Sequence, residues 1–205
     1  MSLPKLYVIL DQETLNARAL SVGVLARELR DAGVTLVQYR DKVSTPQEIL
    51  RAAAEISEAF AGIEATLVMN DRPELAKAAG WNAVHVGQGD LPVSAAKKLV
   101  DFVGISTHYG TQVLEADTTE ADYVAIGPVF ATSTKKDADP VVGLEGVRRA
   151  RSCTTKPLVA IGDITLENAQ SVIDAGADSV AVISGIFIAG RSVEDVARDF
   201  LARLR

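Results

Sequence analysis

The chain has 205 residues, of which 48% are hydrophobic and 23% are charged, a composition typical of one globular domain, which we expect to span residues 1–205. Its formal net charge of −6 argues against a nucleic-acid-binding protein, and no apolar run approaches the ~20 residues of a membrane-spanning helix. The single cysteine excludes an internal disulfide and the N-terminus shows no signal-peptide pattern, so we expect a cytoplasmic protein.

Eight short apolar runs, rich in valine and isoleucine, recur along the chain. Such runs are typical of parallel strands that are buried on both faces. Between them lie segments with apolar residues three and four positions apart, such as 21–33 and 45–62, and this spacing predicts amphipathic helices. In chain order the predicted strands span 5–11, 35–41, 66–71, 83–88, 102–108, 123–130, 157–163 and 179–185.

Three of the predicted helix-to-strand junctions share one design. Each contains a glycine, Gly33, Gly80 or Gly176, between the end of the helical pattern and the next apolar run. Glycine at this place is typical of a left-handed helix C-cap. The sequence therefore predicts a series of repeated βα units.

Polar residues follow nearly every predicted strand, and this placement favours a closed barrel. In an open, doubly wound sheet a ligand contacts the strands near one switch point, whereas in a barrel all carboxyl ends surround one mouth. We therefore expect a single (β/α)₈ TIM barrel. The polar strand ends are Asp11, Arg40, Lys42, Asn70, Asp71, Gln88, Asp90, Ser106, His108, Thr132 to Lys135, Gly162, Asp163 and Ser184.

The segment "QYRDK" places Gln38, Arg40 and Lys42 at alternate positions, so they share one side if the strand continues. Arginine and lysine together can bind a phosphate or pyrophosphate group. The alternative is a strand end that carries solvated surface charges.

Asp71 and Asp90 follow adjacent predicted strands. Two carboxylates that face one space suit Mg²⁺, which takes one or two carboxylates together with phosphate oxygens and water. The alternative is that each aspartate is the N-cap of the following helix.

The polar loop "GPVFATSTKK" follows the sixth predicted strand. Thr132, Ser133 and Thr134 offer hydroxyl and backbone N–H groups, and Lys135 offers a charge. Loops after late barrel strands often bind phosphate, although a surface loop of this composition is an equal alternative.

The two histidines lie in different settings. His85 is inside an apolar run, where we expect a structural role. His108 is at a strand end and could act as an acid or base, but a structural or ligand-orienting role is favoured because the sequence shows no partner for it. Cys153 lies away from the strand ends and is interpreted as inert.

The ordered series "QYRDK", "NDR", "VHVGQGD", "GISTH", "GPVFATSTKK", "VGLEG" and "VAVISGI", from about Tyr7 to Phe187, resembles thiamine phosphate synthase. The resemblance implies a (β/α)₈ barrel and a transferase. The reaction would join 4-amino-2-methyl-5-hydroxymethylpyrimidine diphosphate to 4-methyl-5-(2-phosphooxyethyl)thiazole. Pyrophosphate would leave first, and the thiazole nitrogen would then attack the pyrimidine-methyl cation.

The resemblance also implies roles for individual residues. Arg40, Lys42 and Lys135 would be the catalytic cations, because negative charge grows on the departing pyrophosphate. Asp71 and Asp90 would bind Mg²⁺. The pyrimidine diphosphate would contact Gln38, Tyr39, Arg40, Asp41, Lys42, Asn70, Ser106 and Lys135, and the thiazole phosphate would contact Thr132, Ser133, Thr134, Gly162, Asp163, Ile183 and Ser184.

The stretch "VAIGDIT" departs from the family, in which this strand ends "IGGI". Asp163 replaces the second glycine, and its carboxylate would repel a phosphate. Either the side chain turns away to cap a helix that starts near Thr165, or thiazole phosphate binds weakly, or the second substrate differs. Two other functions stay open: a thiazole tautomerase that uses His108, and a non-catalytic barrel that binds a phosphorylated ligand. The patterns do not predict an oligomeric state.

Overall fold

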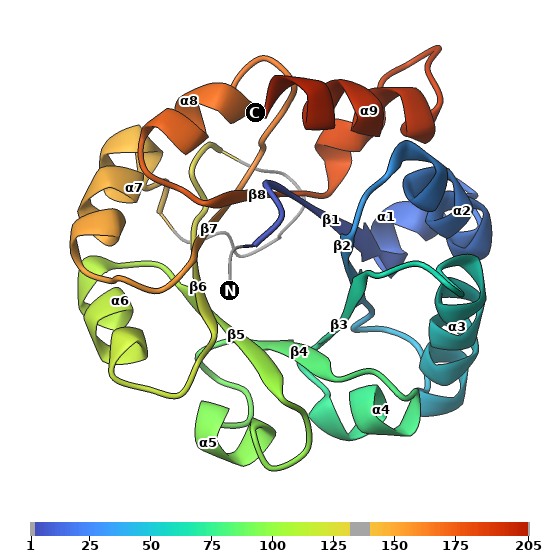
Figure 1. The fold of residues 1–205 in the computed structure, drawn as a ribbon, viewed down its shortest axis with the longest axis horizontal. Helices are drawn as coiled ribbons and strands as arrows, with labels where there is room; N and C mark the ends of the chain where they lie inside the picture. Colours follow the sequence, from blue (N-terminus) through green and yellow to red (C-terminus); the bar gives the residue numbers. More distant parts are fainter. Residues whose placement is uncertain (1–2, 132–139, 205) are drawn as a thin grey trace.

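The computed structural model describes residues 3–131 and 140–204. Eight parallel strands form a closed barrel in chain order, and β8 pairs with β1 to complete it. Figure 1 shows the strands as an inner ring with helices around them. The predicted (β/α)₈ barrel is therefore confirmed. The strands are β1 (Leu6–Asp11), β2 (Leu36–Arg40), β3 (Thr66–Asn70), β4 (Ala83–Val86), β5 (Phe102–Thr107), β6 (Tyr123–Ile126), β7 (Leu158–Ile161) and β8 (Ser179–Val182).

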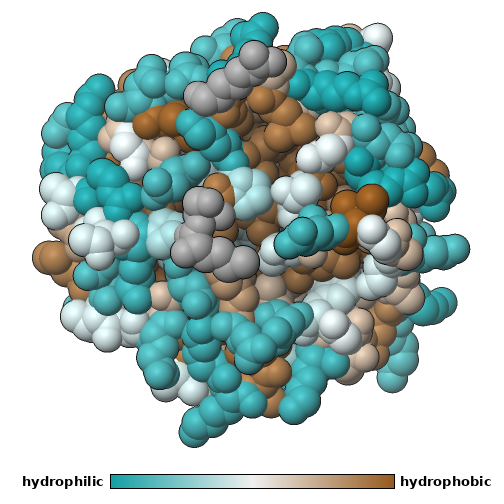
Figure 2. All heavy atoms as spheres, viewed as in Figure 1, coloured by the Kyte–Doolittle hydropathy of each residue, from teal (hydrophilic) through white to brown (hydrophobic). Residues whose placement is uncertain are grey.

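Helices follow the strands and form the outer layer (Figure 1). None of those described has the length and apolar character that a membrane crossing requires. Viewed from the same side, Figure 2 shows mostly hydrophilic residues over this outer ring. The helices are α1 (Gln12–Ala17), α2 (Val22–Ala32), α3 (Pro46–Ala59), α4 (Pro73–Ala78), α5 (Val93–Ala96), α6 (Gly110–Asp117), α7 (Gly143–Ser152), α8 (Ala169–Asp174), the short 3₁₀ helix η1 (Ser184–Ile186) and α9 (Val193–Arg203).

Each strand lies inside one of the eight predicted apolar runs, usually one to four residues shorter at its carboxyl end. The three junction glycines have positive φ angles of 90° at Gly33, 74° at Gly80 and 112° at Gly176. These values are in the left-handed region that glycine adopts without steric cost. The repeated design of the βα units is thus confirmed.

The strands bury both faces, because alternate side chains point to opposite sides of a strand. The outward side chains pack with the helices in a large core. The inward side chains form a smaller cluster that fills the barrel, so the barrel is closed below its mouth. This inner cluster contains Tyr7, Ile9, Leu36, Val68, Ala83, Tyr123, Ala125, Val159 and Ala181.

Candidate active site

A cavity of about 510 Å³ opens at the carboxyl ends of the strands. Every strand contributes to its lining, as expected for the mouth of a barrel. The inner cluster forms its apolar floor, and polar side chains from the strand ends and the following loops form its walls. One lining residue from each strand, in order, is Ile9, Gln38, Asn70, His85, Ser106, Ala125, Val159 and Ala181.

Strand β2 presents Gln38, Arg40 and then Lys42 to the cavity, so the predicted shared side is observed. The guanidinium group of Arg40 forms an ion pair with Asp11 at the end of β1. Asp11 is only 3% exposed and also accepts hydrogen bonds from the backbone N–H and the hydroxyl of Thr14, at 3.0 and 2.7 Å. Asp11 therefore both caps α1 and fixes the direction of Arg40.

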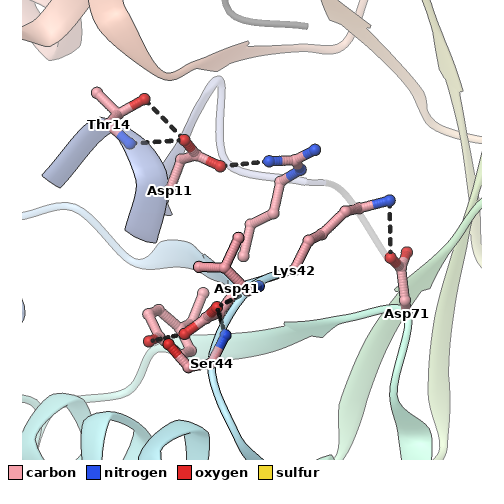
Figure 3. Close-up of polar contacts among 9 residues, drawn as sticks. Asp11, Thr14, Asp41, Lys42, Ser44 and Asp71 are labelled. Carbon is pink, nitrogen blue, oxygen red and sulfur yellow. Dashed lines mark hydrogen bonds and ion pairs between the residues drawn. The ribbon is translucent and has the colours of Figure 1, made fainter. Parts of the chain in front are cut away.

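Tyr39 and Asp41 lie on the other side of β2, although the resemblance placed them among the residues that contact the pyrimidine diphosphate. The Tyr39 ring packs in the core between barrel and helices, and its hydroxyl donates to Asp41 at 2.9 Å. Asp41 accepts from the backbone N–H of Ser44 at 2.9 Å. Figure 3 shows Asp41 directed toward Ser44, while Lys42 extends toward Asp71. In this structure Tyr39 and Asp41 shape the loop that carries Lys42.

Asp71 and Asp90 meet at the wall of the cavity. Burial raises the pKa of Asp71, and its hydrogen-bonding contact with the Asp90 carboxyl raises that pKa further, whereas Lys42 lowers it. The Lys42 ammonium lies 3.1 Å from the Asp71 carboxylate (Figure 3). The two carboxylates therefore lie together beside one ammonium group. A single positive charge does not balance two negative charges.

Neither aspartate is a helix N-cap, so that alternative is wrong. The N-cap of α4 is Arg72 and that of α5 is Pro92. Asp90 instead accepts from the N–H of Gly87 at 2.7 Å, which closes the turn after β4. Asp71 has φ 61°, a left-handed angle that aspartate and asparagine tolerate better than most residues. Its backbone turn directs the carboxylate toward the mouth instead of into the next helix.

Two carboxylates are a small donor set for a metal ion. Among the described residues, no group of three or more histidine, cysteine, aspartate or glutamate side chains is placed to hold one. Mg²⁺ nevertheless binds through one or two carboxylates when a substrate phosphate and water complete its shell. Asp71 and Asp90 fit that chemistry, and they do not fit a closed structural metal site.

The ends of β7 and β8 form the wall that includes Gly162, Asp163, Ile183 and Ser184. Gly162 has φ 121°, and a Cβ atom there would lie 2.6 Å from the backbone of the loop after β6, so only glycine fits. Asp163 is exposed at the cavity, with φ 49°.

The alternative in which Asp163 caps a helix near Thr165 is wrong. Helix α8 begins four residues later, at Ala169, and its N-cap is Asn168. The Asn168 side chain accepts from the N–H of Thr165 at 2.8 Å and donates to the backbone carbonyl of Asp163 at 3.0 Å. The Asp163 carboxylate has no hydrogen bond or ion pair with any residue in 3–131 or 140–204. Within these residues no positive charge therefore offsets the carboxylate at the cavity wall.

Four residues expected to bind phosphate, Thr132, Ser133, Thr134 and Lys135, lie outside the described residues. His108 lies inside them and lines the cavity. Its Nδ1 lies 2.8 Å from the carbonyl oxygen of Gly127, and only a protonated nitrogen can donate to that oxygen. One ring nitrogen of His108 therefore serves to hold the loop after β6. Cys153 is the C-cap of α7, away from the cavity.

The sequence did not identify Tyr7 and Tyr123 as part of the site. Tyr7 lines the cavity, and Tyr123 lies directly beneath it in the inner cluster. A signal was present, because a tyrosine inside an apolar strand must find a hydrogen-bond partner for its hydroxyl group. His85 is buried as expected, and burial lowers its pKa to about 4.

Comparisons with known proteins agree with this geometry. A family model described as thiamine monophosphate synthase matches residues 6–186. The thiamine-phosphate synthase of Koribacter versatilis is 50% identical over 194 residues, which are 92% of this chain and 91% of that protein. The thiamine-phosphate synthase of Chloroflexus aurantiacus is 37% identical over 200 residues, 97% of this chain and 91% of that protein.

Comparison with a solved structure supports the same family assignment. Thiamine phosphate pyrophosphorylase from Pyrococcus furiosus superposes with a TM-score of 0.85 at 29% identity, covering 98% of this chain and 95% of that chain. These relatives favour a synthase over a tautomerase or a non-catalytic barrel, and the activity is that of a thiamine-phosphate synthase, a transferase. The chain belongs to the thiamine monophosphate synthase family.

Proposed function

We propose that this chain joins a pyrimidine diphosphate to a thiazole phosphate in the 510 Å³ cavity, with Mg²⁺ held between Asp71 and Asp90. One observation carries the proposal: the two carboxylates meet beside Lys42 in a cavity that Arg40 also lines. This arrangement suits a diphosphate with its metal ion, since the carboxylates hold the metal and the cations hold the phosphate oxygens.

The charge balance of the cavity supports a metal-dependent diphosphate site. Among the described lining residues, Arg40 and Lys42 face the three carboxylates of Asp71, Asp90 and Asp163. Arg40 and Lys42 are also paired with Asp11 and Asp71 respectively. A diphosphate would therefore meet too little positive charge without a divalent ion. We assign further positive charge to Lys135, on the resemblance alone.

The reaction needs positive charge at the leaving group more than it needs a base. Mg²⁺ would supply Lewis-acid neutralisation of the pyrophosphate oxygens as they gain charge. Arg40, fixed in place by Asp11, and Lys42 would contact the same oxygens and would not have to reorganise during bond breaking. The thiazole nitrogen then forms the new carbon–nitrogen bond with its own lone pair. No nucleophilic side chain takes part in this mechanism.

We place the thiazole phosphate at the opposite wall, beside Gly162, Ile183 and Ser184. Gly162 lets the backbone approach a ligand closely, and Ser184 offers a hydroxyl group. The first test of both assignments is calorimetric titration of each substrate with and without Mg²⁺, followed by a coupling assay. Binding of the pyrimidine diphosphate that does not depend on Mg²⁺, or the absence of product, would contradict the proposal. The cytoplasmic setting expected from the sequence stays a prediction.

Lys42→Ala should lower kcat on the order of a hundredfold, with little change in the KM for thiazole phosphate. Charge on the pyrophosphate grows in the transition state, so a missing cation matters more there than in the bound substrate. The Lys42 side chain is half exposed, so loss of its ion pair with Asp71 should change the melting temperature very little. Steady-state kinetics for both substrates and a thermal melt make the measurement. Lys98→Ala, at an exposed lysine on the outer ring, is the matched control. A change confined to the thiazole phosphate KM would show that Lys42 serves the other substrate.

Asp163→Gly should tighten thiazole phosphate binding by at least about fivefold, because a carboxylate ~4 Å from a phosphate costs about 1 kcal/mol even in water. The variant removes a carboxylate that no described residue pairs with, and glycine keeps the φ of 49° without strain. The melting temperature should change little, because relief at this angle is offset by the greater freedom of glycine in the unfolded chain.

Titrations at low and moderate ionic strength measure this effect, and salt should narrow the difference between the two proteins. Asp163→Asn is the matched control, because it removes the charge and keeps a residue that tolerates the left-handed angle. If neither variant binds thiazole phosphate more tightly than the native protein, the phosphate does not lie beside residue 163.

A further inference from the structure

The cavity wall formed by the ends of β7 and β8 is mostly apolar. Its polar side chains are Asp163 and Ser184, and within the described part of the chain it has no lysine, arginine or histidine. The described cations that line the cavity, Arg40 and Lys42, come from β2 and the loop after it, and each is already paired with an aspartate. The apolar members of the wall are Val159, Ile161, Ile164, Ala181 and Ile183.

Asp163 and Ser184 border the same part of the cavity. They follow β7 and β8, which are paired neighbours in the barrel. A Cβ atom at Gly185 would lie 2.2 Å from the carbonyl oxygen of Ile164. The chain directly after Asp163 therefore contacts the chain directly after Ser184.

The backbone that carries Asp163 is held from both sides. The carbonyl oxygen of Gly162 accepts from the N–H of Phe130 at 3.1 Å, and that of Asp163 accepts from the Asn168 side chain at 3.0 Å. Gly162 also packs so closely against the loop after β6 that no Cβ atom fits there. The backbone therefore has little freedom to carry the carboxylate away from the cavity.

The two polar side chains of this wall offer a ligand one acceptor and one donor. Neither forms a hydrogen bond or ion pair with any residue in 3–131 or 140–204. The carboxylate of Asp163 accepts, and the hydroxyl of Ser184 can donate. An alcohol donates one hydrogen bond and accepts others, so it matches this pair. A phosphate dianion brings only acceptors and negative charge, so Asp163 would repel it and would find no donor on it.

We propose that the site also takes the thiazole alcohol, which is the same ring with a free hydroxyl group in place of the phosphate ester, and couples it to the pyrimidine diphosphate. This second activity rests on the function proposed above, because it uses the same cavity and the same leaving group. The tail hydroxyl donates to Asp163 and accepts from Ser184, while its two-carbon chain packs against Ile183.

The bond changes are those of the phosphorylated reaction. The bond between the pyrimidine methylene carbon and the diphosphate oxygen breaks, and pyrophosphate leaves with the electron pair. The thiazole nitrogen then gives its lone pair to the methylene carbon, and the product is a thiazolium cation with a free hydroxyl group. The tail hydroxyl keeps its proton, so the step needs no base, oxidant or further reactant.

The first experiment compares three thiazoles in the coupling assay with the pyrimidine diphosphate and Mg²⁺. They carry a phosphorylated hydroxyethyl tail, a free hydroxyethyl tail and an ethyl tail, and mass spectrometry identifies each product. For the native protein we expect kcat/KM for the alcohol to lie within about tenfold of the phosphate value, because the wall repels the phosphate. The ethyl compound should be at least about tenfold poorer than the alcohol, because a site that hydrogen-bonds a hydroxyl group discriminates against a ligand without one.

The second experiment assigns this preference to Asp163. Asp163→Gly removes both the repulsion and the acceptor, so the ratio of kcat/KM for the alcohol to that for the phosphate should fall at least about tenfold. Asp163→Asn removes the charge and keeps an oxygen acceptor, so use of the alcohol should persist while use of the phosphate improves. Asp174→Asn, at an exposed carboxylate on α8, is the matched control and should leave the ratio unchanged. A thermal melt confirms that each variant is folded.

The outcomes separate this inference from the proposed function. A native protein that couples the phosphate but not the alcohol would overturn the inference and leave the proposed function intact. No product from either thiazole would contradict the proposed function and the inference with it. An ethyl compound as good as the alcohol, or a ratio that Asp163→Gly leaves unchanged, would show that Asp163 does not recognise the hydroxyl group and would also overturn the inference.

Discussion

Asp71→Asn should reduce the rate of coupling by about a hundredfold to a thousandfold while the protein stays folded. The carboxylate meets Asp90 at the cavity wall, where Mg²⁺ would bridge the protein to the departing pyrophosphate. An asparagine side chain keeps the size and one oxygen, but it removes the charge that attracts a hard divalent cation. Asparagine also accepts the φ of 61° at this position, so the backbone turn is retained.

The same substitution should leave the free energy of unfolding of the metal-free protein unchanged or slightly higher. Burial and the nearby Asp90 raise the folded-state pKa of Asp71 above its ordinary value. The unfolded chain therefore releases this proton first as the pH rises, and stability is lost between the ordinary pKa and the raised one. That loss is complete once the pH is above the raised pKa. Asparagine does not ionise, so the variant avoids it.

A coupling assay with and without EDTA, together with a thermal melt without metal, tests both expectations. Asp90→Asn should behave similarly, although its side chain also closes the turn at Gly87. Asp174→Asn on α8, an exposed carboxylate far from the mouth, is the matched control. Turnover that survives EDTA and both cavity substitutions would exclude the metal role of the two aspartates.

The fold could be predicted because its signals are local and repeated. Runs of valine and isoleucine mark strands that are buried on both faces, and glycines such as Gly33 mark the helix ends. The closure of the sheet was predicted from the polar residues that follow nearly every strand. The alternation along β2 also predicted the common side of Gln38, Arg40 and Lys42. The same alternation places Tyr39 and Asp41 on the opposite side, whereas the family resemblance alone treated the five residues as one unit.

The hydrogen bond between Tyr7 and Tyr123 inside the barrel could not be predicted from the sequence. Tyr7 and Tyr123 are 116 residues apart, and their contact depends on the register of a closed sheet. A tyrosine in an apolar run shows that a partner is needed, but it does not identify the partner. The reason for a glycine at residue 104 could not be predicted either. The Tyr123 ring occupies the space that a side chain would need there, and this contact exists only because β5 and β6 are paired.

The conformation of Asp163 was also beyond local reasoning. The segment "DITLEN" offers three candidate N-caps, Asp163, Thr165 and Asn168, and all three residue types suit that position. The choice depends on where the chain meets the barrel after leaving β7. Asn168 takes the N-cap position and closes the turn at Thr165, which leaves the Asp163 side chain at the cavity.

Arg40→Ala should have two large effects, because the proposed function gives Arg40 a role in the reaction and its ion pair with Asp11 supports the fold. Its side chain is 19% exposed, compared with 50% for Lys42, so its charge is less screened by water. We expect turnover to fall about a hundredfold to a thousandfold, since a fixed cation is lost from the leaving group. The substitution also leaves the carboxylate of Asp11 buried without its ion-pair partner.

Breaking a buried ion pair by removing one partner costs about 3–5 kcal/mol. Asp11 keeps two hydrogen bonds from Thr14, so we expect the lower end of that range. For a chain of this size each kcal/mol corresponds to roughly 2–4 °C, so the melting temperature should fall by about 6–12 °C. Lys42→Ala, which breaks only a half-exposed pair, should lose activity without this loss of stability.

The double variant Asp11→Asn with Arg40→Ala separates the two roles of Arg40. Asparagine removes the unpaired charge and remains a good N-cap for α1, so most of the lost melting temperature should return. Turnover should not return, because no cation has been restored at the pyrophosphate. Thermal melts and steady-state kinetics on the two single variants and the double variant complete the cycle. If the double variant regains activity along with stability, Arg40 acts only by supporting the fold; if it regains neither, Asp11 has a role at the cavity beyond pairing with Arg40.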